Sequence, residues 1–86
     1  MSWFVYILRC ADDSLYTGIT TDLDRRLDEH NHCPQKGARY TRARRPVRLA
    51  YVEPCDSRSV ASQREYYLKQ LSRSEKLDLV KKSNLR

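Results

Sequence analysis

Two apolar, strand-like runs lie close together at the start of the chain. Residues 3–10 read WFVYILRC and residues 15–20 read LYTGIT, and both are rich in the β-branched and aromatic residues that favour strands. Only the residues ADDS separate them, and Asp and Ser side chains readily bond nearby backbone amides in turns. We therefore predict an antiparallel hairpin over residues 3–20. Gly18, inside its second strand, is expected to mark either a close backbone approach or a bulge.

The 86 residues that contain this hairpin are enough for one domain, over residues 1–86. A helix is expected over about residues 22–31, with a capping hydroxyl at Thr21 and one face formed by Leu23, Leu27 and His30. A third strand is expected over 47–53 and a short last helix over 74–81. Between them, a helix over about 58–71 is expected to pack on Val60, Tyr67, Leu68 and Leu71. The order β-β-α-β-α-α predicts an α+β domain, with a small three-stranded sheet flanked by helices.

The positive charge of the chain is concentrated in one segment. The net charge is +6, from 17 Lys and Arg against 11 Asp and Glu. Residues 35–48, which we call the basic segment, contain no acid and six of the cations: Lys36, Arg39, Arg42, Arg44, Arg45 and Arg48. Such a local excess favours nucleic acid as the partner, and Tyr40 among these cations is placed to stack on a base. A membrane is not expected, because the segment has no apolar stripe and no apolar run approaches the roughly 18 residues of a span.

The cysteines indicate a reducing environment. Cys10, Cys33 and Cys55 are odd in number and form no C-x-x-C pair, which favours free thiols in the cytoplasm. The first residues have neither the basic lead nor the cleavage site of a signal peptide. A zinc site built from His30, His32 and Cys33 would have a spacing that matches no common ligand pattern, so we do not expect one.

Several of these elements together resemble the GIY-YIG nuclease family. The two strand motifs of that family correspond to residues 4–6 (FVY) and 16–18 (YTG), with nine residues between the two tyrosines. The next helix carries Arg26 and, one turn later, His30, and a later helix carries Glu65. The resemblance covers most of the chain, which looks like the small stand-alone members of the family.

The resemblance implies a catalytic set of five residues: Tyr6, Tyr16, Arg26, His30 and Glu65. Glu65 would bind Mg²⁺ (or Mn²⁺), Arg26 would stabilise the transition state, and Tyr6 or Tyr16 would help to deprotonate water. The chemistry of the residues agrees, because Arg26 and His30 share one helix face and a guanidinium pairs two phosphoryl oxygens at once. We favour Tyr6 as the base, with Tyr16 positioning water or phosphate. Lys69, one turn after Glu65, either pairs with that carboxylate or contacts phosphate.

The sequence therefore predicts an endonuclease that hydrolyses DNA phosphodiesters in repair or recombination. So small a domain cannot read a long base sequence, so we expect selectivity for single-stranded or branched DNA, or targeting by a protein partner. The basic segment, with Tyr40, and Lys69 would bind the strand, while the catalytic set lies elsewhere. Two alternatives stay open: a noncatalytic nucleic-acid-binding module that retains the nuclease fold, and a protein-interaction adaptor.

Overall fold

The computed structural model describes residues 2–33 and 35–83, so residues 1, 34 and 84–86 of the expected domain lie outside it. The strands are β1 (Trp3–Arg9), β2 (Leu15–Thr20) and β3 (Arg48–Cys55). The longer helices are α1 (Leu23–His32), α3 (Arg58–Lys69) and α4 (Arg73–Ser83). The α+β fold class and the order of these elements are confirmed. A four-residue helix in the basic segment, α2 (Arg39–Arg42), is an addition that the sequence pattern does not predict.

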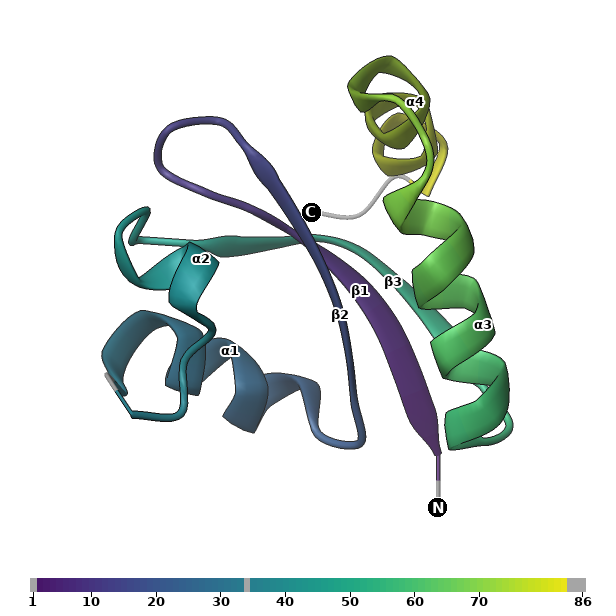
Figure 1. Ribbon diagram of the computed structural model, residues 1–86, viewed down its shortest axis with the longest axis horizontal. Helices are drawn as coiled ribbons and strands as arrows, with labels where there is room; N and C mark the ends of the chain where they lie inside the picture. The colour runs from purple at the N-terminus through teal and green to yellow at the C-terminus, as the bar shows by residue number, and fades with distance from the viewer. Residues whose placement is uncertain (1, 34, 84–86) are drawn as a thin grey trace.

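The sheet is antiparallel with the order β2-β1-β3, so the first strand of the chain lies at its centre. Helices α1 and α2 lie on one side of the sheet, and α3 and α4 lie on the other (Figure 1). Because β1 is covered on both faces, its residues 3–8 are apolar or aromatic without alternation, and only Arg9 at its end is charged. In the β1–β2 register Tyr6 lies opposite Gly18 and Leu8 lies opposite Tyr16, which puts both tyrosines on the same face.

Two small hydrophobic cores result, one on each face of the sheet. The core on the α1 side contains Tyr6, Leu8, Cys10 and Val47, against which Leu23 and Leu27 pack. The core on the α3 side contains Val5, Cys55, Ala61 and Leu68. All three cysteines are free thiols, as expected. Within residues 2–33 and 35–83, no helix is long and apolar enough to cross a membrane.

The buried face of α3 differs in part from the expected one. Val60 and Tyr67 are 42% and 54% exposed, whereas Ala61 and Leu68 are fully buried. The expected packing of Leu68 and Leu71 is confirmed, since Leu71 packs against the core that contains Leu68. The expectation for Val60 and Tyr67 was wrong by one residue, which turns a helical side chain by about 100°. The small side chain of Ala61 lets the helix approach the sheet closely, which a pattern that favours large apolar residues overlooks.

The helix caps and the hairpin turn follow local side-chain chemistry. The carboxylate of Asp22 accepts from the backbone N–H of Arg25 at 3.1 Å, so Asp22 caps α1 and the expected cap at Thr21 is wrong by one residue. In the turn between β1 and β2, Asp12 accepts from the Ser14 backbone N–H, as predicted. The short turn fixes the register that brings the strand tyrosines together.

Candidate active site

The centre of the candidate site is a chain of hydrogen bonds between residues far apart in the sequence. Tyr6 on β1 and His30 on α1 are both buried, and the Tyr6 hydroxyl lies 2.9 Å from Nε2 of His30. Nδ1 of His30 lies 2.8 Å from Oγ1 of Thr41, whose hydroxyl donates to the Ala38 carbonyl at 3.0 Å. Because the Thr41 proton is directed at Ala38, Thr41 accepts from Nδ1–H, and Nε2 accepts from the Tyr6 hydroxyl. His30 is thus a neutral acceptor for the Tyr6 proton.

The surroundings of this pair favour the uncharged form of both groups. Burial lowers the pKa of His30 to about 4, and the positive charges of Arg26 and Arg45 act in the same direction. Burial also raises the pKa of Tyr6 to about 12, although the neighbouring Arg26 guanidinium opposes the rise. At neutral pH Tyr6 therefore keeps its proton, and uncharged His30 is in position to receive it.

Tyr16 on β2 meets the same histidine. Its ring centroid lies 5.3 Å from that of His30, and the Tyr6 ring lies 6.0 Å from His30, both edge to face. Tyr16 also stacks on Tyr40 of α2, with centroids 5.9 Å apart. The structure therefore gathers both sequence-predicted tyrosines at one imidazole, and Tyr6 is the one that forms a hydrogen bond to it.

Gly18 leaves the space that the Tyr6 hydroxyl occupies. A Cβ atom at residue 18 would lie 2.5 Å from the Tyr6 hydroxyl oxygen, 2.7 Å from its Cζ and 3.2 Å from Cε2 of Tyr16. These distances to the Tyr6 atoms are shorter than any van der Waals contact. Gly18, the glycine of the second strand motif, is thus needed because any larger side chain would collide with Tyr6, the tyrosine of the first motif.

We expect Gly18→Ala to displace Tyr6 from His30. The added methyl group should lower the free energy of unfolding by about 1–3 kcal/mol, as overpacking of a core typically does. It should also lower the rate of any reaction that needs the Tyr6–His30 bond. Urea unfolding measures the first effect. A Gly18→Ala chain with wild-type stability would show that Tyr6 has room to move.

Arg26 is held one turn before His30 by two contacts of its Nη1 atom. Nη1 donates to Oε1 of Glu29 at 2.9 Å and to the Lys36 carbonyl at 2.5 Å. These contacts fix the guanidinium beside Tyr6 and leave its Nε and Nη2 protons for other acceptors. The side chain is 24% exposed, so its outer edge is open to an incoming phosphate. The structure therefore brings Arg26 and His30 together around Tyr6, as the helix spacing predicts.

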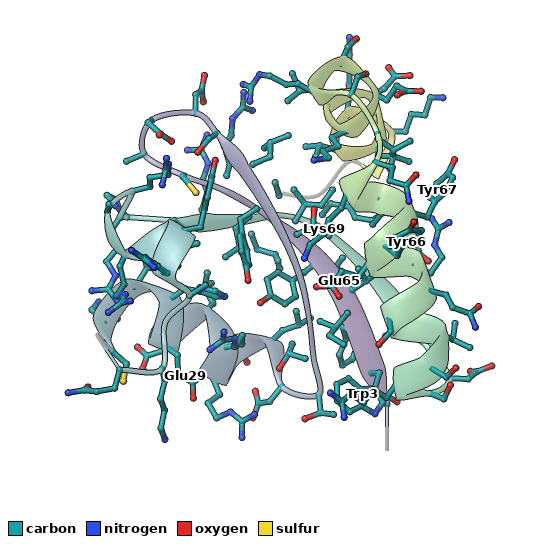
Figure 2. All side chains as sticks on the ribbon, viewed as in Figure 1. Trp3, Glu29, Glu65, Tyr66, Tyr67 and Lys69 are labelled. Atoms are coloured by element: carbon teal, nitrogen blue, oxygen red, sulfur yellow. The ribbon has the colours of Figure 1, made fainter. Side chains whose placement is uncertain are left out.

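Glu65 approaches the tyrosines from α3, on the helix side that carries buried Ala61 and Leu68. Burial is the main cause of the raised pKa of Tyr6, and the negative charge of Glu65 adds a smaller contribution in the same direction. Figure 2 shows Glu65 and Lys69 extending from α3 toward the sheet, and Nζ of Lys69 lies 3.4 Å from Oε2 of Glu65. Of the two roles expected for Lys69, the ion pair is the one this geometry displays.

The oxygen donors at this point suit a divalent cation that is held mainly by water and substrate. Within residues 2–33 and 35–83, no three His, Cys, Asp or Glu side chains are grouped so that they could hold a metal ion. Glu65 supplies one partly exposed carboxylate, which already attracts the cation of Lys69. Mg²⁺ commonly keeps several waters and binds through one or two carboxylates and substrate phosphates, so Glu65 fits the ligand role predicted for it.

The basic segment folds against the catalytic set, although a separate location was expected. Four of its residues contact catalytic residues. The carbonyl of Lys36 contacts Arg26, and Tyr40 contacts Tyr16. Thr41 contacts the His30 ring, and Arg45 donates to the His30 carbonyl. The expectation was wrong because distance along the chain was taken for distance in space. The unpredicted α2 packs on α1 and returns the segment to the site.

The six cations of the basic segment fall into two groups. Arg44 and Arg45 contact other protein groups: Arg44 pairs with Asp12 at 3.1 Å and lies over the Tyr40 ring at 3.9 Å. Arg45 donates to two backbone carbonyls near the end of α1, at 2.6 and 3.0 Å. The other four side chains are exposed: Lys36, Arg39, Arg42 and Arg48. Strand binding by the basic segment stays a prediction for all of these cations and for Tyr40.

Sequence reasoning missed two residues that support the site, Thr41 and Asn31. Thr41 is fully buried and sets the orientation of His30. The Asn31 amide donates to the Val47 carbonyl at 2.9 Å and accepts from its N–H at 2.7 Å, which ties α1 to the start of β3. No local pattern marks either residue, because each acts through a partner more than ten positions away. The one sequence signal near Thr41 is the density of cations in the basic segment, which indicates a functional segment but does not single out Thr41.

We expect buried His30 to make the fold sensitive to acid. Its pKa is about 4 in the folded chain, against 6.5 for free imidazole, so between these values the unfolded chain binds a proton that the folded chain does not. The stability linked to His30 is complete above pH 6.5 and is lost as the pH falls to 4, by roughly 3 kcal/mol.

Urea unfolding of the wild type, His30→Gln and exposed His32→Gln at several pH values measures this loss. The wild type and His32→Gln should lose this stability on acidification, and His30→Gln should lack that contribution. An equal acid dependence in all three chains would contradict the assignment.

The fold and the site are of the class expected for a nuclease domain, because proton-carrying and charged side chains from several elements meet at one place. A strand tyrosine bonded to a helix histidine, with an arginine beside it and a carboxylate opposite, has the chemistry that this cleavage needs. The family profile described as the GIY-YIG catalytic domain matches residues 2–78. The chain belongs to the GIY-YIG nuclease family, and nucleic acid is the substrate class that this membership implies.

Proteins similar to this chain are small and are matched over most of their length. A UPF0213 protein of Desulfotalea psychrophila is 62% identical over 82 residues, which are 95% of this chain and 74% of the relative. A UPF0213 protein of Clostridium perfringens is 46% identical over 84 residues, 96% and 87% of the two chains. The solution NMR structure of a UPF0213 protein from Bacillus halodurans is 48% identical, with a TM-score of 0.59 and coverage of 94% and 84%. That of a protein from E. faecalis is 41% identical, with a TM-score of 0.65 and coverage of 100% and 90%.

Proposed function

We propose that this chain is a divalent-metal-dependent endonuclease that hydrolyses DNA phosphodiesters. The observation that carries the proposal is the buried hydrogen bond from Tyr6 to His30, with the Arg26 guanidinium beside it and the Glu65 carboxylate nearby. Hydrolysis needs a proton acceptor for the attacking water, a cation at the phosphoryl oxygens and help for the leaving oxygen. Tyr6 with His30, Arg26 and Glu65 provide one group for each need.

Tyr6 and His30 act together as the base. The Tyr6 oxygen accepts a proton from the attacking water while its own proton passes to Nε2 of His30, so the relay never requires a free phenolate. Burial and the neighbouring arginines oppose the imidazolium that this forms, so the negative charge of the bound phosphodiester has to stabilise it. A relay is needed because a tyrosine with a pKa of about 12 does not ionise by itself near pH 7. Arg26 donates to the phosphoryl oxygens and stabilises negative charge near Tyr6. Tyr16, against the same imidazole, positions the water or the phosphate.

Glu65 is the residue that would hold Mg²⁺ or Mn²⁺. When bound, such an ion neutralises charge on the phosphoryl group and favours departure of the leaving oxygen. Glu65 would give up its ion pair with Lys69 to do so, and the released ammonium group, on a 54% exposed side chain, would be available to a neighbouring phosphate. Lys69 thus serves both of the roles that its spacing allows, one before and one after substrate binding.

The substrate that we propose is single-stranded or branched DNA. Lys36 contacts Arg26 through its carbonyl and Lys69 pairs with Glu65, and both side chains are exposed. With the other exposed cations of the basic segment they would hold the phosphates of a strand. An open site of this kind contacts backbone rather than base edges, so it selects the shape of DNA and not its sequence. Cutting of this type serves DNA repair or recombination, with a protein partner supplying the target site.

The proposal is tested by incubating the purified chain with labelled single-stranded, duplex and branched DNA, with Mg²⁺ or Mn²⁺. We expect internal cuts in single-stranded or branched DNA, with loss of cutting in Tyr6→Phe, Arg26→Ala and Glu65→Gln. Binding of DNA without any cutting would favour the noncatalytic nucleic-acid-binding module instead. The adaptor alternative predicts neither cutting nor salt-sensitive binding.

A further inference from the structure

A groove beside the catalytic set has no role in the function proposed above. It lies at the end of the sheet where α1 and α3 both begin, and its volume is about 400 Å³. Trp3 and Ile19 form an apolar wall, and Arg25, Arg26 and Arg58 supply the cations of the lining. Sequence analysis singled out only Arg26 among these residues. An aromatic wall next to several guanidinium groups is the composition of a nucleotide-binding surface.

The groove is continuous with the catalytic set on both of its helices. Arg26 lines the groove and also contacts the site, so the two share one guanidinium. On α3, Arg58 comes seven residues, close to two full turns, before Glu65, which puts both on the same side of the helix. Figure 2 shows Trp3 at the same side of α3 as Glu65, nearer the start of the helix. A strand that leaves the site toward this end of the sheet therefore enters the groove.

The charge of the groove suits an anion. Its acid, Glu29, lies between two of its cations, with Oε1 2.9 Å from Arg26 and Oε2 3.7 Å from Arg25. One carboxylate against three guanidinium groups leaves an excess of two positive charges. The Arg58 guanidinium lies over the Trp3 ring, 5.8 Å from its centroid, which holds that charge at the wall of the groove. Arg25 and Arg58 are both exposed, so they can reach a ligand.

We propose that this groove binds the nucleotide next to the scissile phosphate. Arg25 and Arg58 hold the adjoining phosphate, and the sugar and base lie against Trp3 and Ile19. The inference rests on the proposed function, because it takes the ligand to be the strand that Arg26 holds at the point of cleavage. Such a subsite would fix the direction in which the strand crosses the site.

The test measures binding, so it does not depend on cleavage. Trp3 is the single tryptophan of the chain, and its fluorescence therefore reports on this groove alone. With a single-stranded DNA oligonucleotide in EDTA, we expect the Trp3 emission to be quenched as the complex forms. Arg25→Gln and Arg58→Gln should each weaken binding by about threefold to tenfold, and each should reduce the slope of log affinity against log salt by about 0.7. Lys82→Gln, which removes an exposed cation from α4, should change neither quantity.

The outcomes separate this inference from the proposed function. The groove assignment would be overturned if Trp3 emission stayed unchanged at saturating DNA and both arginine variants kept the wild-type salt slope. If the wild type still cleaved DNA, the proposed nuclease function would stand. Quenching and lowered slopes in a chain that never cuts DNA would support the groove and overturn the nuclease. Equal quenching by a polyglutamate peptide would show a general anion site and overturn the assignment to a nucleotide. A chain that binds no DNA would overturn both.

Discussion

Replacing Glu65 by Gln is expected to lower the rate of DNA cleavage by about 10³-fold, while the affinity for DNA stays the same or rises slightly. Gln has the shape of Glu without its charge, so the variant loses the metal ligand but keeps the packing of α3 on the sheet. Loss of one group that stabilises the charge of a transition state typically costs about 10²–10³-fold, and loss of the metal adds to this. DNA binding should not weaken, because the change frees Lys69 from its ion pair.

Single-turnover cleavage and fluorescence anisotropy, measured on the same substrate, separate these two effects. Asp78→Asn is the matched control, since it also converts a carboxylate to an amide but lies exposed on α4, paired with Lys82. It should cut DNA at the wild-type rate. Cleavage by Glu65→Gln within a few-fold of the wild type would remove Glu65 from the reaction.

The second large effect concerns the proton relay. We expect Tyr6→Phe to slow cleavage by about 10²–10⁴-fold, the usual contribution of a general base, because the Phe ring fills the same space without the hydroxyl. His30→Gln should cause a loss of similar size. Since the two residues move a single proton, the double variant should be no slower than the slower single variant.

Single-turnover rates of the four chains complete this double-mutant cycle, with Tyr66→Phe as the matched control. Tyr66 follows Glu65 directly on α3, but it is 72% exposed and should tolerate the change. Losses that multiply in the double variant would show that Tyr6 and His30 act independently. A wild-type rate for Tyr6→Phe would leave Tyr16 as the base, the alternative that the sequence leaves open.

Much of the fold could be predicted because it depends on short-range patterns. The hairpin follows from two apolar runs around a four-residue turn, and each predicted helix or strand end lies within two residues of the observed one. The buried face of α3 was misjudged in part because the difference between faces is one residue, and Ala61 carries little hydrophobic signal. The helix α2 is too short for a periodic pattern and rests on its contacts with α1.

The candidate site was predictable as a set of residue types, but not as a geometry. Spacing places Arg26 and His30 on one helix face, and the strand register follows from the hairpin. By contrast, Thr41 matters only because His30 is eleven residues earlier and folds back onto it. The groove walled by Trp3 likewise needs the starts of two helices to meet at one end of the sheet. Such features arise from tertiary packing, on which a one-dimensional pattern carries little information.

The central claim is that one metal-bound site on this small domain breaks DNA phosphodiesters. The most direct test is single-turnover cleavage of labelled single-stranded and branched DNA by the wild type, in Mg²⁺, in Mn²⁺ and in EDTA, with Glu65→Gln in parallel. The account predicts cutting with either metal, none in EDTA and recovery when metal is restored, with the metal-dependent rate about 10³-fold lower in Glu65→Gln. Cutting that persists in EDTA, cutting by Glu65→Gln within a few-fold of the wild-type rate, or no cutting of any DNA with either metal would contradict it.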